Sequence, residues 1–243
     1  MFGSLAVRGA AALLGAAMLA SVARGQGAAG GCAGNTLTPA EQRAGWRSLF
    51  DGKTTSGWRA YRGRDVPVGW QVVNGALMRV AGGAGDIVTT GEYRDFELAL
   101  DWNIAPGGNS GIFYRATESE PNVYESAPEM QILDDERFRP DGLSLLTSAG
   151  SDFGLYPTRR GVVKPAGQWN HVLIVVRGDH VEHWLNGVKV VDYELGSPDW
   201  KARVARSKFA AWPRYGTAPR GHIALQDHGS WVAFRNIRIR ELP

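Results

Sequence analysis

The chain has 243 residues, of which 44% are hydrophobic and 10% aromatic, enough for one large β domain or two small ones. The formal net charge is +3, and the basic residues form no block, so the composition does not favour a polyanionic partner such as nucleic acid. Cys32 is the only cysteine, which excludes an intramolecular disulfide and a thiolate metal cluster.

The N-terminal residues have the pattern of a secretory leader. Arg8 precedes an apolar run at residues 9–22, and Ser21-Val22-Ala23 is a small-x-small site of the kind that signal peptidase cleaves. We therefore predict a signal peptide over residues 1–23 and a periplasmic or secreted mature protein. The run is too short to span a bilayer, although an uncleaved anchor stays open. Lipid attachment at Cys32 is disfavoured, because the preceding Ala-Gly-Gly lacks the usual bulky aliphatic residue.

Residues 24–44 read as a linker followed by a short helix. The linker is rich in Gly and Ala. Thr38-Pro39-Ala40-Glu41 then supplies an N-cap, a proline at the first helical position and a capping-box glutamate. We expect a helix to about Ala44, and a single domain over residues 45–243.

That domain reads as about eleven short strands with little helix. Asn74-Gly75 and Asn186-Gly187 each predict a tight hairpin, and a phase slip near Asn236 suggests a bulge in the last strand. Ser197-Pro198 starts one further helix. Residues 134–168 are irregular and are predicted to form a lid or rim over a groove. Hairpin-linked strands make antiparallel sheets, so the fold class is all-β, a sandwich or jelly roll, with a barrel left open.

Polar side chains recur at matching positions of three predicted strands. Glu129 and Gln131 share one strand face, opposite Met130 and Ile132, since side chains alternate along a strand. Three sets of this kind could meet over one groove. The alternative is three separate solvated faces. The sets are Asn109 with Arg115, Glu129 with Gln131, and His222 with Gln226 and His228.

Other signals are weaker. Zinc-hydrolase, phosphate-loop, dinucleotide and Gly-x-Ser-x-Gly motifs are missing from the sequence. His171, His180 and His183 are interpreted as structural. Asp134, Asp135 and Glu136 could hold a divalent cation, or could simply be solvated. The sequence indicates no required cofactor and leaves a cation open.

Several motifs between Gly45 and Leu242 together resemble the 3-keto-disaccharide hydrolase domain family of secreted bacterial proteins. The resemblance implies a concanavalin-like jelly roll of two antiparallel sheets and activity on glycosides oxidised at C3. In place of a histidine that family members often carry after Leu-Asp-Asp, this chain has Arg137-Phe138-Arg139. The motifs are Leu49-Phe50-Asp51-Gly52-Lys53 with Gly57-Trp58, Asn109-Ser110-Gly111-Ile112 through Arg115, residues 129–135, 164–170 and 184–187, and Gly221-His222 through Gly229 with residues 234–237.

Cleavage of a 3-keto-glycoside needs three groups. A base removes the C2 proton, an acid assists the leaving oxygen, and a cation or donor steadies the enolate. On the resemblance, the base is Glu129 or His222, the acid is Asp134 or His228, and the enolate is steadied by Arg115 with Lys164. The remaining residues predicted to contact sugar are Asn109, Ser110, Gln131, Trp184 and Gln226.

Two other functions stay open. Glu129-x-Gln131-x-x-Asp134 imperfectly resembles the Glu-x-Asp-x-x-Glu strand of retaining β-glucanases, whose carboxylates must lie close together, but Gln131 replaces the central acid. A non-catalytic sugar-binding or laminin-G-like module would instead use Trp102 and Trp184 as stacking platforms.

Overall fold

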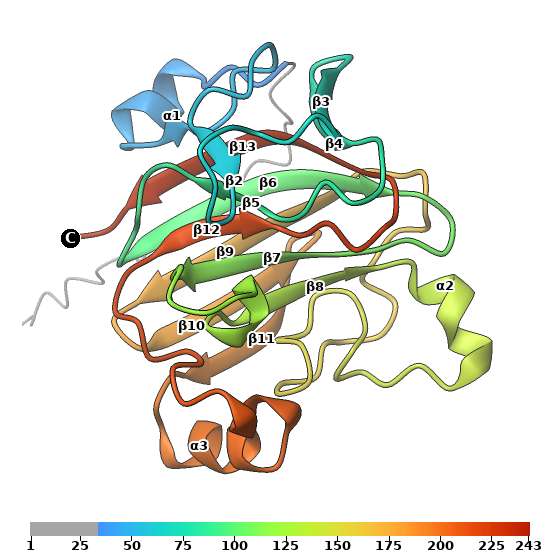
Figure 1. Cartoon of the computed structure of the whole chain (residues 1–243), viewed down its shortest axis with the longest axis vertical. Helices are drawn as coiled ribbons and strands as arrows, with labels where there is room; N and C mark the ends of the chain where they lie inside the picture. The colour runs from blue at the N-terminus through green and yellow to red at the C-terminus, as the bar shows by residue number, and fades with distance from the viewer. Residues whose placement is uncertain (1–33) are drawn as a thin grey trace, which may run out of the picture. The chain divides into compact units, whose positions relative to one another are not determined.

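The computed structural model describes residues 34–243, in which thirteen strands form two antiparallel sheets stacked face to face (Figure 1). The predicted signal peptide, most of the linker and Cys32 lie outside the described residues. The prediction of an all-β sandwich is confirmed. In the described part of the chain, no helix has the length and apolar character needed to cross a membrane.

The larger sheet has eight strands. Its order is β11 (Val188–Glu194), β10 (His180–Leu185), β9 (Asn170–Arg177), β6 (Phe96–Ile104), β13 (Val232–Glu241), β4 (Ala76–Arg79) and β3 (Trp70–Val73), with β1 (Arg47–Ser48) also pairing with β13.

The smaller sheet has five strands, which in Figure 1 lie in front of the larger sheet. Its order is β2 (Trp58–Ala60), β5 (Ile87–Thr89), β12 (His222–Leu225), β7 (Asn109–Ala116) and β8 (Glu129–Leu133). Strands distant in sequence are therefore neighbours, and β12 brings the C-terminal part of the chain between β5 and β7.

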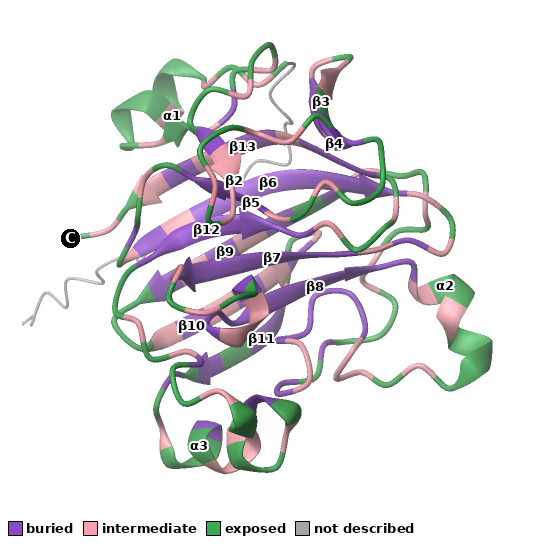
Figure 2. Ribbon diagram, viewed as in Figure 1, coloured by how far each residue is buried: buried purple, intermediate pink, exposed green. Residues whose placement is uncertain are grey.

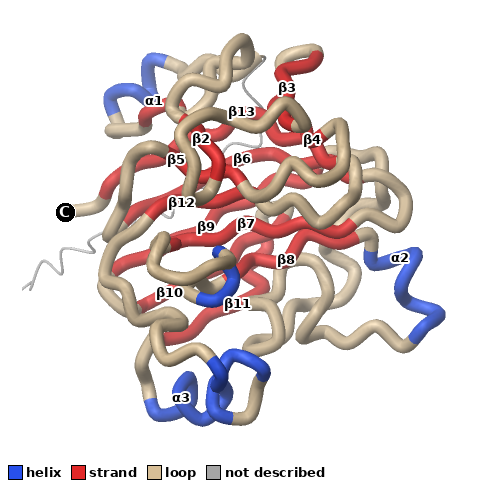
Figure 3. The backbone as a smooth tube through the Cα atoms, in the orientation of Figure 1, coloured by secondary structure: helices blue, strands red, loops and turns tan. Residues whose placement is uncertain are grey.

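The helices are short, and Figure 3 shows α1, α2 and α3 at the periphery of the sheets. Thr38 and Glu41 form the predicted capping box of the first helix, and the Ser197 side chain accepts from the backbone N–H of Trp200 at the start of α3. The helices are α1 (Pro39–Arg43), η1 (Val123–Glu125), α2 (Asp135–Phe138), η2 (Arg139–Asp141), α3 (Pro198–Ala205) and η3 (Lys208–Ala211).

The core lies between the sheets, and Figure 2 shows both as largely buried. In the smaller sheet, Ile112 and Tyr114 of β7 and Met130 and Ile132 of β8 point into this core. Each fully buried apolar side chain contributes roughly 1.5–3 kcal/mol. Alternation then sends the intervening residues of the same strands to the outer face.

Both predicted Asn-Gly hairpins are confirmed. Asn74 and Gly75 have φ values of 50° and 76°, and Asn186 and Gly187 have 49° and 81°. Positive φ at both central residues is the geometry of a type I′ turn, whose twist matches that of the strands it joins.

The long irregular segment before β9 covers an edge of the smaller sheet. Gly150 N donates to Gln131 O at 2.8 Å, and Phe153 N donates to Glu129 O at 3.0 Å. These bonds pair the backbone of β8, the last strand of its sheet, which would otherwise expose unpaired groups. The predicted lid or rim is therefore mainly an edge cover.

The predicted bulge in β13 is present at Asn236, where the register with β6 shifts and φ is 54°. Its side chain donates to Asp101 Oδ2 at 2.7 Å and accepts from Asn35 N at 3.1 Å. The bulge is therefore held by the asparagine's tolerance of positive φ and by its two side-chain bonds.

We expect Asn236→Ala to lower the free energy of unfolding by about 2–3 kcal/mol, because it adds backbone strain and removes both side-chain bonds. Asn236→Gly removes only the bonds and should cost less. Urea denaturation measures both variants. Equal losses would show that the strain contributes nothing.

Candidate active site

A cavity of about 480 Å³ lies on the outer face of the five-stranded sheet. Carboxyl and amide groups from four strand segments line its floor, and aromatic residues line its walls. Its polar lining residues are Asp86, Asn109, Asn122, Glu129, Gln131, Gln226, Asp227, His228 and Lys208, and its aromatic ones are Tyr61, Tyr124 and Phe153.

The position of Glu129 depends on a glycine in the next strand. Glu129 is the first residue of β8, and Gly111 lies on the adjacent β7. A Cβ built at residue 111 would lie 2.0 Å from Glu129 Oε1, so no other residue type leaves room for this rotamer. The carboxyl of Glu129 therefore extends across β7 toward β12.

The Glu129 carboxyl is almost sealed from water. Its residue is 6% exposed, and Oε1 has no hydrogen-bond partner within residues 34–243. Burial raises the pKa of Glu129 to about 8; Lys208 lowers it, while Asp86 and Asp152 raise it. The carboxyl consequently carries a proton at neutral pH, which suits a general acid.

Asp86 is a second carboxyl at the cavity, immediately before β5. Its Oδ1 accepts from the backbone N–H of Asp227 at 2.8 Å. Burial raises the pKa of Asp86 to about 6, opposed by the Asp227 N–H and assisted by the Asp227 charge. Asp227 itself is paired with Arg79 at 2.5 Å. Asp86 is therefore ionised at neutral pH, whereas Glu129 is not.

Lys208 supplies a positive charge at the cavity. Its Nζ lies 4.6 Å from the centre of the Phe153 ring and 5.7 Å from that of Tyr124. Within residues 34–243 no carboxylate lies at ion-pair distance from Lys208, so this ammonium group is held by aromatic faces. It remains available to an anionic or developing negative oxygen.

Amide oxygens complete the floor. Gln226 Oε1 and Asn109 Oδ1 are buried and lack partners among the described residues. The side-chain amide of Gln131 donates to Thr147 O at 3.3 Å. Unpaired buried acceptors cost free energy unless a ligand supplies donors, and sugar hydroxyls are suitable donors.

Arg115 does not join this site, contrary to the strand-parity prediction. The pairing of β7 with β12 is irregular here, and Arg115 has a φ of 53°. Its guanidinium donates to Arg94 O at 3.1 Å and to Gly178 O, and Gly178 joins two strands of the other sheet. The bulge turns the side chain away from the face of Glu129, so Arg115 ties the two sheets together.

Ser110 and Asp134 are also turned away from the cavity. Ser110 is fully buried and donates to Gln226 O at 2.9 Å. Asp134 Oδ2 accepts from Gly107 N at 2.8 Å and holds the loop before β7. Neither residue lines the cavity, so the predicted roles in sugar binding and proton transfer lack the necessary position.

The two candidate histidines of the C-terminal motif are separated. His228 is exposed and lines the cavity. His222 is buried outside the cavity lining, with Nδ1 at 3.1 Å from Gly91 O and Nε2 at 3.4 Å from an Arg59 nitrogen. The predicted meeting of Glu129, Arg115 and His222 at one centre therefore does not occur.

The predicted contacts from Lys164 and the tryptophans lie elsewhere. Lys164 is exposed beside β9, and its Nζ donates to Trp169 O at 3.1 Å. Trp184 lies on β10 of the other sheet and donates to Glu182 at 2.7 Å. Trp102 is 1% exposed in the core. None of the three lines the cavity, and neither tryptophan offers a stacking face there.

The acids after β8 do not converge on a cation. Asp135 Oδ1 accepts from Ala149 N at 2.9 Å, Asp134 bonds the Gly107 loop, and Glu136 is exposed. The candidate metal site at these residues is therefore not supported.

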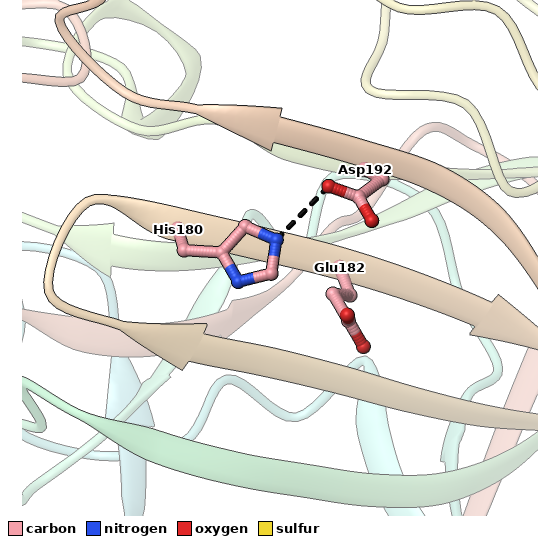
Figure 4. A group of neighbouring side chains, drawn as sticks. All are labelled: His180, Glu182 and Asp192. Atoms are coloured by element: carbon pink, nitrogen blue, oxygen red, sulfur yellow. Dashed lines mark hydrogen bonds and ion pairs between the residues drawn. The ribbon is translucent and has the colours of Figure 1, made fainter.

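Within residues 34–243, one group has metal-ligand geometry, namely His180, Glu182 and Asp192 on the other sheet (Figure 4). His180 Nε2 lies 2.9 Å from Asp192 Oδ1. Lys189 pairs with both carboxylates, at 3.1 Å from Glu182 Oε1. An ammonium group thus already balances these acids, and the cluster is a surface ion-pair network.

The three histidines interpreted as structural have structural contacts. His171 Nδ1 lies 2.8 Å from Asp101, and His180 belongs to the ion-pair network. Burial lowers the pKa of His183 to about 4, and its Nε2 lies 2.9 Å from Tyr114 Oη in the core.

Sequence reasoning missed Asp86, Lys208, Phe153 and Tyr124. Asp86 lies two residues before Val88, whose side chain is on the outer face of the sheet. Because side chains alternate along a strand, extending the predicted strand back to residue 86 would have placed Asp86 on the same face. Lys208 follows a helix without any motif. Only the packing of η3 against the sheet places it at the cavity.

Comparisons with known proteins agree on a family. A family model described as a 3-keto-alpha-glucoside-1,2-lyase-like domain matches residues 45–240. A 3-keto-disaccharide hydrolase from Bacteroides thetaiotaomicron is 34% identical over 230 residues, covering 82% of this chain and 79% of that protein.

Solved structures agree as well. Two crystal structures from Parabacteroides distasonis, each described as a candidate glycosyl hydrolase, superpose with TM-scores of 0.79 and 0.68. Their sequences are 37% and 30% identical, and they cover 86% and 81% of this chain and 99% of each relative. These similarities support a carbohydrate-active protein.

We expect Glu129→Gln to stabilise the protein increasingly as pH rises. Because the folded pKa of about 8 exceeds the value of about 4.3 in an unfolded chain, the folded state retains a proton that the unfolded state releases. The free energy of unfolding therefore falls between about pH 4 and about pH 8 in the wild type, by a few kcal/mol at most.

Glu129→Gln has no proton to release, so its free energy of unfolding should not fall in this way. The difference between its melting temperature and that of the wild type should therefore grow from about pH 4 to about pH 8. Thermal denaturation at several pH values measures it, with exposed Glu194→Gln as the control. An advantage independent of pH would contradict the buried, protonated carboxyl.

Proposed function

The chain belongs to the 3-keto-alpha-glucoside-1,2-lyase-like family, and from this membership we propose that it cleaves the glycosidic bond of sugars oxidised at C3. The observation that carries the proposal is a dry, protonated carboxyl and an unpaired ammonium group in one cavity, those of Glu129 and Lys208. An acid and a cation are two of the three groups that this reaction requires of a protein.

A ketone at C3 changes which bonds of the sugar break easily. It acidifies the hydrogen on C2, because loss of that proton gives an enolate whose negative charge lies on the C3 oxygen. When the enolate collapses, a C1–C2 double bond forms and the C1 substituent leaves. Addition of water to that double bond completes a hydrolysis, and without it the reaction is a lyase reaction.

Glu129 fits the role of acid for the leaving oxygen. A sugar alkoxide is a poor leaving group and needs a proton as the C1–O bond breaks. Glu129 holds a proton at neutral pH, and its Oε1 has no partner among the described residues that would compete for it. The predicted acids Asp134 and His228 are turned away or exposed at the rim.

Lys208 fits the role of cation for the enolate, which the sequence had suggested for Arg115 and Lys164. A preorganised positive charge stabilises negative charge most strongly in a site with little water. Lys208 is an exposed residue, but the rings of Tyr124, Phe153 and Phe209 lie beside its ammonium group without neutralising its charge.

The leader pattern of residues 1–23 supports a periplasmic or secreted location for this enzyme. The floor amides Asn109, Gln131 and Gln226 bind hydroxyls of the oxidised ring. A conventional retaining glucanase is disfavoured, because it needs two carboxyls close together. Position 131 carries an amide, and Asp134 points away from the cavity, so Glu129 is the one carboxyl that this segment presents there.

The direct test is product analysis. We expect the wild type to convert a 3-keto-disaccharide to monosaccharide products, detected by mass spectrometry, and to leave the unoxidised disaccharide intact. Glu129→Gln should lower kcat about 100-fold or more on the oxidised disaccharide, since general acid catalysis contributes on this scale. Cleavage of the unoxidised sugar would indicate a glycosidase, and binding without turnover a lectin.

The charge of Lys208 has its own test. Lys208→Gln should lower kcat about 100-fold with a smaller effect on KM, because the cation acts on charge that develops in the transition state. Lys208→Arg keeps the charge and should retain more activity. Lys201→Gln, on the exposed side of α3, is the matched control. Equal activity of the Gln and Arg variants would rule out the electrostatic role.

A further inference from the structure

We propose that Asp86 is the base that removes the C2 proton, so that Asp86 and Glu129 form an acid–base pair across the floor of the cavity. This assignment rests on the proposed function. It replaces the earlier candidates, Glu129 and His222, with a residue that the sequence did not indicate.

Strand register sets the distance between the two carboxyls. Leu225 of β12 pairs with Ile87 of β5 and with Ile112 of β7, so the next row holds Asp86, Gln226 and Gly111 in adjacent strands. The bond from Gln226 N to Gly111 O continues this row. Strands β5 and β7 are two spacings apart, about 10 Å between axes.

The carboxyls of Glu129 and Asp86 lie at opposite ends of this row, so they would flank a sugar ring bound between them. The Glu129 carboxyl lies over Gly111, at the β7 end, and Asp86 lies at the β5 end. Between them the floor is Gln226, whose buried Oε1 has no partner within residues 34–243. A sugar ring resting on Gln226 would have one carboxyl on each side.

The surroundings of the two carboxyls favour an ionised Asp86 and a protonated Glu129, as the roles of base and acid require. Asp86 Oδ1 accepts a backbone N–H, which favours the ionised form, and the residue is only partly buried. Its pKa is about 6, whereas that of Glu129 is about 8. Two carboxyls with pKa values pushed apart by their environments are the usual basis of acid and base roles.

The proton balance closes over one cycle. Asp86 takes the C2 proton, the C3 enolate forms and collapses, and the C1–O bond breaks as Glu129 protonates the leaving oxygen. Water then adds to C1 and gives a proton to the Glu129 carboxylate, while Asp86 returns its proton to C2. The net reaction is hydrolysis, and both carboxyls regain their starting states.

The pH profile follows from the same pair. Activity requires ionised Asp86 and protonated Glu129, so kcat/KM should be highest between about pH 6 and about pH 8. The other titratable or charged groups facing the pair are Asp227, which Arg79 neutralises, Asp152 beside β8, His228 at the rim and Lys208.

Leaving-group dependence tests the assignment. The substrates are a 3-keto-disaccharide and the 3-keto-glucoside of nitrophenol, whose phenolate leaves without an acid. We expect Glu129→Gln to lose about 100-fold or more on the disaccharide but less than about tenfold on the nitrophenyl substrate. Asp86→Asn should lose about 100-fold or more on both, and should also lose exchange of the C2 hydrogen in deuterated water.

Asp65→Asn, an exposed aspartate outside the cavity, is the matched control, and thermal denaturation checks that each variant folds. Wild-type turnover reports on the proposed function, and the pattern of the variants reports on Asp86. If Asp86→Asn cleaved the disaccharide at the wild-type rate, or still exchanged the C2 hydrogen, the assignment would be overturned. An inactive wild type would overturn the function and the assignment together.

Discussion

The site depends on one unfavourable burial, that of the Glu129 carboxyl. Its Oε1 has no hydrogen-bond partner among residues 34–243, and no cation is bonded to the group, so the side chain stays protonated well above the usual pH for a glutamate. This is tolerable only because Gly111 leaves the space that the carboxyl occupies. The sheet thus stores free energy at the carboxyl that we propose as the acid.

The rest of the sandwich supports that position from below. Met130 and Ile132 fix β8 to the core, while the alternate residues Glu129 and Gln131 face the cavity. The backbone of β8 is bonded to β7 on one side and to residues 150–153 on the other. A strand paired on both edges and packed beneath holds its outer side chains rigidly, as the proposed proton transfer requires.

The opposite wall comes from elements with little regular structure. Ser207 caps η3 by accepting from Phe209 N at 3.1 Å, and Phe209 stacks on Tyr215 at 4.1 Å between ring centres. This packing holds Lys208 beside Phe153 and Tyr124. The charge is therefore positioned by aromatic contacts and not by a salt bridge, which would have neutralised it.

The sequence by itself determined the fold class, both Asn-Gly hairpins, the bulge at Asn236 and the polar face of Glu129 and Gln131, because alternation and turn chemistry are local properties of the chain. Only the tertiary structure decided which polar residues meet. A bulge at Arg115 reset the strand phase and turned that side chain to the other sheet. Strand order and helix packing bring Asp86 and Lys208 to the same cavity as Glu129, and both depend on contacts between distant segments. Strand parity can indicate the face on which Asp86 lies, but not which residues lie beside it.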